Sequence, residues 1–243
     1  MDHAIRVDNL SKSYGGIKAI DNFSFSVEYG KVFGLLGANG AGKTTTIECI
    51  LGTKVADRGQ ISVLGLDSKT DRKKLYENVG VQFQEAHYQE NIKVCELCEV
   101  TASLYRDPSD WIKLLDDFGL SDKRNSFVKD LSGGQRQRLF IVLALIPKPK
   151  LVFLDELTTG LDARARRDVW QVLLKLRKGG LTVLLTSHFM DEVEALCDEI
   201  CILKNGAPVY FGTVTEAIKQ SPYDKFEDAY LWFTEEVSED ESL

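Results

Sequence analysis

Residues 37–44 read Gly37-Ala38-Asn39-Gly40-Ala41-Gly42-Lys43-Thr44 and fit the spacing G-x-x-x-x-G-K-[ST]. The apolar run Val32 to Leu36 precedes them and is typical of a strand buried on both faces, and a helix is predicted from Thr44 to about Leu51. Such glycines let the backbone curl until successive N–H groups point inward, and a helix N-terminus adds partial positive charge. The segment therefore predicts a phosphate-binding loop between a strand and a helix.

Two side chains of this loop suit a nucleotide with magnesium. Lys43 would supply a mobile cation for the β- and γ-phosphates, and Thr44 would offer a hydroxyl to Mg²⁺. The alternative is an ordinary glycine-rich turn, which the intact lysine and threonine disfavour. The residues predicted here to bind the nucleotide are Gly37, Asn39, Gly40, Ala41, Gly42, Lys43, Thr44 and Thr45.

A second apolar run, Leu151 to Leu154, ends in Asp155-Glu156. A buried strand of a parallel sheet presents its last residues at the carboxyl edge, where the phosphate loop would also lie. Asp155 could then hold Mg²⁺ through water, and Glu156 could polarise the attacking water. Taken alone, two acids after a buried strand are equally typical of a solvated turn.

The composition limits the class of protein. Of the 243 residues, 44% are hydrophobic and 28% charged, which is ordinary for a soluble globular protein. The net charge of −7 argues against non-specific nucleic-acid binding. The longest apolar candidate, Leu139 to Ile146, stops at Pro147 and is too short to span a bilayer. Five cysteines and no N-terminal apolar region favour a reducing, cytosolic setting.

Helical patterns between the buried strands predict an α/β core over 1–86 and 130–233. Residues 87–129 are predicted to form an inserted helical subdomain, and residues 234–243 an acidic, frayed tail. Within the subdomain, Asp107 is the predicted N-cap and Pro108 the first residue of a helix. The apolar stripe of that helix is Trp111, Leu114, Leu115 and Phe118, and Gly119 would end it.

Together with Leu131-Ser132-Gly133-Gly134-Gln135, these motifs resemble the ATP-binding subunits of ABC transporters. The pentapeptide matches the signature of that family, and the resemblance covers roughly residues 5 to 215. It implies a P-loop NTPase core with a mostly parallel sheet, an N-terminal antiparallel β part and the inserted helical subdomain. It also implies a Mg²⁺-dependent ATPase.

The resemblance assigns further site residues. Tyr14 would stack on adenine, and Gln84, after the strand-like Val79 to Phe83, would be a catalytic residue and a ligand of Mg²⁺. His188 matches the switch histidine of the family, and Asp162 matches its D-loop. Each assignment has an ordinary alternative. Tyr14 would be a surface aromatic, Gln84 a strand-end residue and His188 a neighbour of a helix N-cap. The signature residues Ser132, Gly133, Gly134 and Gln135 would cover the nucleotide of a second subunit.

The implied partners follow from a single phosphate loop and a single signature. The chain would pair with itself or a close relative, burying two ATP molecules. It would dock on a separate transmembrane permease subunit at the cytoplasmic face of the membrane, through residues 85–100, with Tyr88, Ile92 and Val94 as contacts. The short insert between Gln84 and Leu131 resembles exporters. The alternative is a soluble ABC ATPase that transports nothing, such as one of iron–sulfur assembly.

Three other features carry predictions. The family usually has proline where this chain has Leu157, and proline would hold Glu156 in an extended backbone. The cysteine pairs Cys95 with Cys98 and Cys197 with Cys201 are assigned to packing rather than to zinc, and the second pair is predicted to lie on one helix. The acidic run Asp191-Glu192-Glu194 is interpreted as a solvated helix face.

Overall fold

The computed structural model describes residues 3–82 and 91–234 of the chain. Within them, an antiparallel sheet has the order β2-β1-β4-β5. Its strands are β1 (His3–Tyr14), β2 (Ile17–Glu28), β4 (Arg58–Val63) and β5 (Leu66–Asp67). Alternate residues of β1 and β2, such as Ile5, Val7 and Phe23, are buried, so one face of the sheet packs inward. This is the predicted N-terminal antiparallel part.

The second sheet has the order β10-β9-β3-β8-β7-β6 and is parallel except between β9 and β10. Every residue of β3, β7 and β8 is buried, which explains their continuous apolar sequences. Phe25 of β2 stacks on Phe33 of β3 with ring centroids 5.2 Å apart, so the two sheets share a core. The strands are β3 (Val32–Gly37), β6 (Val79–Gln82), β7 (Leu151–Leu154), β8 (Thr182–Leu185), β9 (Glu199–Lys204) and β10 (Ala207–Gly212).

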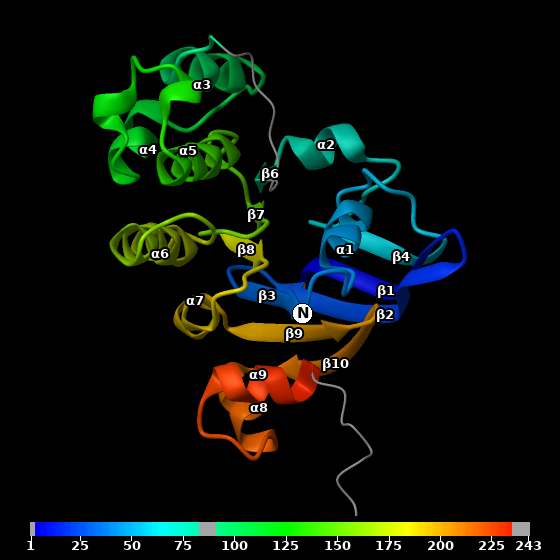
Figure 1. Ribbon diagram of the computed structural model, residues 1–243. Coiled ribbons are helices and arrows are strands. Elements are labelled where there is room, and N and C mark those ends of the chain that lie inside the picture. Colours follow the sequence, from blue (N-terminus) through cyan, green and yellow to red (C-terminus); the bar gives the residue numbers. More distant parts are fainter. Residues whose placement is uncertain (1–2, 83–90, 235–243) are drawn as a thin grey trace, which may run out of the picture.

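Helices cover the sheets in separate groups (Figure 1). One group, α3, α4 and α5, lies at the upper left of the view, and α1 lies at the right beside β1 and β4. The helices are α1 (Lys43–Ile50), α2 (Arg72–Tyr76), α3 (Val94–Ser103), α4 (Trp111–Asp117), α5 (Gly133–Leu145), α6 (Ala163–Lys178), α7 (Met190–Leu196), α8 (Val214–Gln220) and α9 (Phe226–Thr234). One apolar cluster runs from α3 and α4 through α5 to β7 and α6, so the helical group is anchored on the α/β core.

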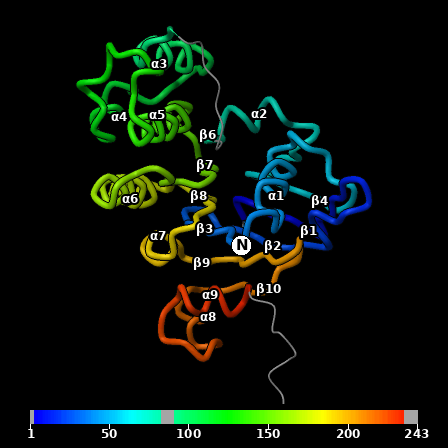
Figure 2. The backbone as a smooth tube through the Cα atoms, viewed as in Figure 1, coloured from blue at the N-terminus to red at the C-terminus, as the bar shows by residue number. Residues whose placement is uncertain are grey.

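The path of the chain places the termini of two helices at the core sheet (Figure 2). Helix α1 follows β3, and α7 follows β8, so both begin where neighbouring parallel strands end. The strand β7, whose end carries Asp155, pairs with β8 on its other side. Three loops therefore converge on one sheet edge.

Two local predictions are wrong. Helix α4 begins at Trp111 rather than at Pro108, because the side chain of Asp110 accepts hydrogen bonds from the N–H groups of Ile112 and Lys113 and caps it. Cys197 and Cys201 do not share a helix. Helix α7 ends at Leu196, and Cys201 lies in β9. Residues 235–243, most of the predicted tail, lie outside the described residues.

Candidate functional site

The phosphate-binding loop connects β3 to α1, as its sequence predicts. Gly37, Gly40 and Gly42 have φ values of 147°, 81° and 104°, which L-residues rarely adopt. A Cβ atom at Gly42 would lie 2.5 Å from the carbonyl oxygen of Ala19. Glycine is therefore required at this position both by backbone conformation and by the close approach of the β2 strand.

Lys43 lies folded against the loop that it follows. Its Nζ donates to the carbonyl oxygens of Gly37 at 2.7 Å and Ala38 at 3.1 Å, and the residue is 7% exposed. Burial lowers the pKa of this amine, while the carboxylates of Asp155 and Glu156 oppose that change. The lysine cation is thus held beside the loop carbonyls and within the field of two acids.

One cavity joins the two motifs that lie over a hundred residues apart in sequence. It has a volume of about 300 Å³, at the low end of the range for ligand pockets. Hydroxyls of Thr44 and Thr45, the ammonium of Lys43 and the two carboxylates all belong to its lining. The lining residues are Ala19, Asn39, Gly40, Gly42, Lys43, Thr44, Thr45, Asp155 and Glu156.

The donor set of this cavity suits Mg²⁺ with a nucleotide. Mg²⁺ takes oxygen ligands and is usually bound by one or two carboxylates together with substrate phosphates and water. The hydroxyl of Thr44 and the carboxylate of Asp155 supply such oxygens. Asp155 is 5% exposed, and burial raises its pKa, whereas the hydroxyl of Thr186, which donates to it at 2.5 Å, and the cation of Lys43 lower it.

Glu156 and His188 are brought together although 32 residues separate them. The Oε1 atom of Glu156 lies 3.0 Å from Nε2 of His188, and Thr159 donates to its Oε2 at 3.4 Å. The N–H of Glu156 donates to the hydroxyl of Thr186 at 2.9 Å. Both side chains remain accessible to solvent, 17% for Glu156 and 37% for His188. A carboxylate beside an imidazole can orient and deprotonate a water molecule.

The expected effect of Leu157 rests on a wrong premise. Glu156 has a φ of 51°, so its backbone is in the left-handed region and not extended. The extended form that a proline at position 157 would favour is therefore not the one observed. Leu157 is fully buried in the apolar core, and its N–H donates to the carbonyl of Thr186 at 3.4 Å.

The signature segment forms the N-terminus of α5. Ser132 is the N-cap, and it exchanges hydrogen bonds with Gln135: its hydroxyl accepts from the Gln135 N–H, and its own N–H donates to the Gln135 side chain. A Cβ at Gly133 would meet open space, whereas one at Gly134 would lie 3.0 Å from Leu161. In Figure 1, α5 lies at the upper left, apart from α1 and the phosphate loop.

Three more sequence-predicted residues can be placed or set aside. Asp162 is the N-cap of α6, and its carboxylate accepts from the N–H groups of Arg164 and Ala165. Tyr14, at the end of β1, is 43% exposed, with Lys12 Nζ 5.3 Å from the centre of its ring. Gln84 lies outside the described residues.

The predicted permease contacts are affected differently. Tyr88 lies outside the described residues. Ile92 is half-buried and packs against the core cluster of α3 to α5. Val94 is fully buried, so the prediction that it contacts a partner is wrong. Among the described residues no helix is both long and apolar enough to cross a bilayer.

Sequence reasoning missed three residues that hold the site together. Thr186, directly after β8, donates to the Asp155 carboxylate and accepts from the Glu156 N–H, so it links the loops that follow β7 and β8. The side-chain amide of Gln137 on α5 donates to the carbonyls of Glu156 and Leu157. The interpretation of Glu192 as part of a solvated helix face is wrong because the residue is 0% exposed. A hydroxyl directly after a buried strand was the signal for Thr186, but no local signal marks the other two.

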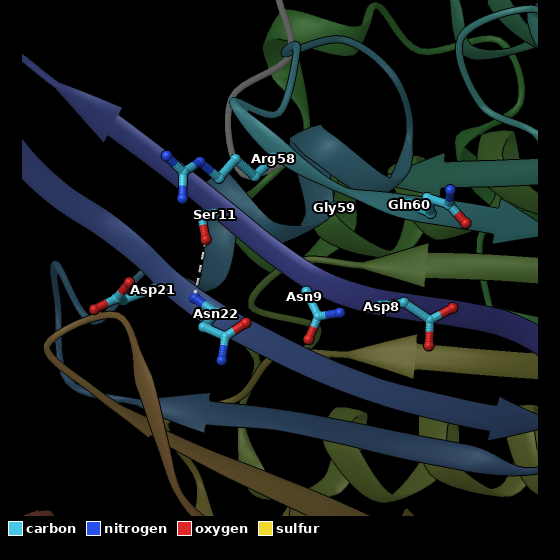
Figure 3. Close-up of a pocket in the computed structure, with 8 residues that line it drawn as sticks. All are labelled: Asp8, Asn9, Ser11, Asp21, Asn22, Arg58, Gly59 and Gln60. Atoms are coloured by element: carbon cyan, nitrogen blue, oxygen red, sulfur yellow. Dashed lines mark hydrogen bonds between the residues drawn. The ribbon is translucent and has the colours of Figure 1, made fainter.

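A second cavity, of about 700 Å³, lies over the N-terminal sheet and contains none of the predicted site residues. Figure 3 shows its side chains on β1, β2 and β4, including a hydrogen bond of 3.1 Å from the Asn22 N–H to the hydroxyl of Ser11. Its lining residues are Asp8, Asn9, Ser11, Asp21, Asn22, Arg58, Gly59 and Gln60. Most of them are exposed, so the cavity is a shallow polar depression.

Comparison with known proteins decides the family. Residues 20–159 match the model of the family described as ABC transporter. The chain belongs to the ABC transporter family. It is an ABC ATPase, which binds ATP and couples ATP hydrolysis to transport. The matched segment contains the phosphate loop, the signature and the Asp155-Glu156 pair.

Relatives of this ABC ATPase include a Nod factor export protein and a drug-resistance protein. It is 38% identical over 219 residues to the Nod factor export ATP-binding protein I of Ralstonia nicotianae. The aligned residues cover 88% of this chain and 68% of the relative. This chain is 37% identical to the daunorubicin/doxorubicin resistance ATP-binding protein DrrA of Streptomyces peucetius, covering 88% and 66% of the two chains. A solved ATP-binding subunit of an ABC transporter superposes with a TM-score of 0.87 at 27% identity, covering 96% and 100%. The predicted fold is thereby confirmed.

Proposed function

We propose that this ABC ATPase powers an exporter by hydrolysing Mg²⁺-ATP in the cavity between the phosphate loop and the Asp155-Glu156 pair. The observation that carries the proposal is the convergence of Lys43, Thr44, Asp155 and Glu156 on one cavity, with His188 on the rim at Glu156. Phosphoryl transfer needs charge compensation on the γ-phosphate and an in-line water. Lys43 would supply the charge compensation, and Glu156 would position the water.

Each residue has a distinct part in the proposed reaction. Backbone N–H groups of residues 39–43 and the α1 N-terminus bind the phosphates. Lys43 leaves its loop carbonyls to neutralise phosphate charge. Thr44 and Asp155 would hold Mg²⁺, which would supply further charge compensation when bound. Glu156 accepts a proton from the attacking water, and His188 holds that carboxylate in place through their 3.0 Å contact. The family resemblance implies that Gln84 would be a further ligand of Mg²⁺ and that Tyr14 would stack on adenine.

The proposed reaction takes place between two chains. Ser132, Gly133 and Gly134 form an exposed helix N-terminus away from this chain's own phosphate loop, so they suit the nucleotide of a second chain. Gln135 supports this terminus through the cap, and Asp162 does the same for α6. The partner is a second copy or a close relative.

The transport assignment rests on the relatives. Both the Nod factor protein and DrrA carry export or drug resistance in their names, and each is more than 35% identical to this chain. We infer a peripheral position at the cytoplasmic face of the membrane, on a separate permease subunit.

Thermal melting tests nucleotide binding. At an ATP concentration of 100 times Kd the gain in unfolding free energy is about 2.7 kcal/mol, which raises Tm by roughly 5 to 10 °C. Lys43→Ala should lose most of this shift, whereas the exposed Lys178→Ala should keep it. No shift in the wild type at millimolar Mg²⁺-ATP would contradict the proposal.

Fractionation of the native host tests the transport half of the proposal. The chain should sediment with membranes together with a polytopic subunit, and be released when that subunit is deleted. A chain that remains in the soluble fraction while bound to iron–sulfur assembly proteins would support the competing function.

A further inference from the structure

We infer that Glu192 is a positioning residue of the ATPase site, which fixes the Glu156 loop relative to the His188 loop. This inference rests on the proposed function, since it concerns the alignment of the same two catalytic side chains. Glu192 lies on α7, four residues after His188, and does not contact the cavity of the phosphate loop.

The contacts of Glu192 join three elements. Its Oε1 accepts a hydrogen bond from the hydroxyl of Thr158 at 2.8 Å and from the indole N–H of Trp170 at 2.9 Å. Thr158 lies two residues after Glu156 in the loop between β7 and α6, and Trp170 lies on α6. One carboxylate oxygen therefore connects the loop of the catalytic carboxylate, α6, and the helix that follows the switch histidine.

Burial makes these contacts strict. Glu192 and Thr158 are both 0% exposed, so neither can exchange its partner for water. An unpaired buried donor costs more than the average hydrogen bond contributes, so the donors of Thr158 and Trp170 favour the arrangement in which both reach Oε1 of Glu192. Burial raises the pKa of Glu192, while the hydroxyls of Ser187 and Thr158 and the indole of Trp170 lower it.

A second pair of contacts holds the other side of the same helix. The guanidinium of Arg166 on α6 lies 4.4 Å from the centre of the Phe189 ring and makes an ion pair of 3.3 Å with Asp191. Phe189 directly follows His188. Helix α6 thus contacts the start of α7 in two places, through Arg166 and through Trp170. Of these two contacts, the one between Trp170 and Glu192 extends to the Glu156 loop, because Glu192 also binds Thr158.

A purely structural role would not need a carboxylate here. Replacing both partners of a buried hydrogen bond by apolar groups of the same shape can be nearly neutral for stability. A carboxylate with two specific donors instead fixes register between elements. Because a displacement of about 1 Å can reduce turnover about 10²-fold, the 3.0 Å contact between Glu156 and His188 would depend on that register.

The test uses variants that keep volume and remove hydrogen bonds. Glu192→Leu removes the acceptor, Thr158→Val removes one donor, and Glu192→Gln keeps an acceptor oxygen. The matched control is Glu194→Gln, on the exposed face of the same helix. For each variant kcat, KM, the ATP affinity without turnover, Tm, and the NMR resonances of the His188 ring in the nucleotide-free protein are measured.

We expect Glu192→Leu and Thr158→Val to fold, to bind ATP with less than about a threefold change, and to lose kcat by about tenfold or more. Glu192→Gln should restore most of kcat, and the double variant should be no slower than the slower single variant. The His188 ring resonances should move in Glu192→Leu and Thr158→Val and stay unchanged in Glu194→Gln.

A folded Glu192→Leu or Thr158→Val protein with wild-type kcat and unmoved His188 resonances would overturn the inference. So would a loss that appears wholly in ATP affinity or in Tm. A wild type that hydrolyses no ATP would instead contradict the proposed function, and the His188 resonances would still decide whether Glu192 positions that side chain.

Discussion

The side-chain amide of Gln137 donates a hydrogen bond of 3.1 Å to the main-chain carbonyl of Glu156. The same amide donates to the carbonyl of Leu157 at 3.0 Å. Gln137 lies on α5, whose N-terminus is the signature segment. The surface that would cover a partner's nucleotide is therefore tied directly to the loop that carries this chain's own catalytic carboxylate.

This link predicts the effect of Gln137→Leu. The substitution leaves two half-buried carbonyls without their donor, which costs about 1–3 kcal/mol of unfolding free energy, and it frees the Glu156 loop. We expect both a lower Tm and a lower kcat, measured by denaturant unfolding and phosphate release. Gln171→Leu, at an exposed position of α6, is the control and should change neither. An unchanged kcat in Gln137→Leu would show that α5 does not hold the loop.

Substitutions at two neighbouring glycines should distinguish the folding of a single chain from the formation of the dimer. A Cβ at Gly133 meets open space, and its φ is compatible with a helix, so Gly133→Ala should fold with unchanged or slightly higher stability, by about 0.5–1 kcal/mol at most. Its methyl group would nevertheless occupy the surface proposed to receive the partner's nucleotide. We expect normal ATP binding to the single chain, loss of the ATP-dependent dimer in size-exclusion chromatography, and loss of turnover.

Gly134→Ala is the companion variant. Its Cβ would lie 3.0 Å from Leu161 and 3.2 Å from the carbonyl oxygen of Gly160, so the neighbouring loop must move and Tm should fall. A Gly133→Ala protein that still dimerises and hydrolyses ATP would contradict the proposed role of the signature.

Tyr14 predicts a base-specific effect. Stacking of a base on an aromatic ring is worth about 1–3 kcal/mol by alanine substitution, so Tyr14→Ala should weaken ATP binding by roughly 5- to 150-fold. Inorganic triphosphate, which has no base, should bind equally to wild type and variant in a calorimetric titration. Tyr29→Ala, at another exposed tyrosine, is the control. Equal losses for ATP and triphosphate would contradict stacking.

Glu192 predicts a pH dependence of stability. Burial raises the pKa of its carboxyl above the ordinary value of 4.5, so above that pH the native chain holds a proton that the unfolded chain has released. The stabilising contribution of this group is complete below pH 4.5 and is lost as pH rises through the folded pKa. The neighbouring Asp191 adds to the effect by raising the same pKa.

The measurement is the difference in Tm between wild type and Glu192→Gln across pH. Because the glutamine does not titrate, the variant should gain stability relative to wild type as pH rises from 4.5. A difference that is constant with pH, or that changes in the opposite direction, would contradict a raised pKa.

Sequence was sufficient where the physical signal was local. The wholly buried strands β3 and β7 have continuous apolar sequences, and the phosphate loop has glycines where its φ values are positive. Both motifs follow strands of one parallel sheet, so their meeting at one edge could be derived from topology alone. The predicted start of α4 is wrong because the side chain of Asp110, and not that of Asp107, accepts hydrogen bonds from the first N–H groups of the helix.

The supporting residues could not be derived because their partners are distant in sequence. Glu192 has the same acidic context as Asp191 and Glu194, and only Thr158, 34 residues away, and Trp170, 22 residues away, make it an interior residue. Gln137 is flanked by arginines and finds its acceptors 19 and 20 residues further along the chain. The backbone of Glu156 is left-handed, with a φ of 51°, which no local propensity indicates.

The most direct test of the account is the rate of phosphate release by Glu156→Gln under saturating Mg²⁺-ATP, with ATP affinity measured in parallel. Glutamine keeps the shape of the side chain but cannot accept the proton of the attacking water. The account predicts a loss of turnover of at least about 10²-fold with ATP affinity nearly unchanged. A Glu156→Gln protein that hydrolyses ATP at the wild-type rate would show that Glu156 is not the catalytic carboxylate.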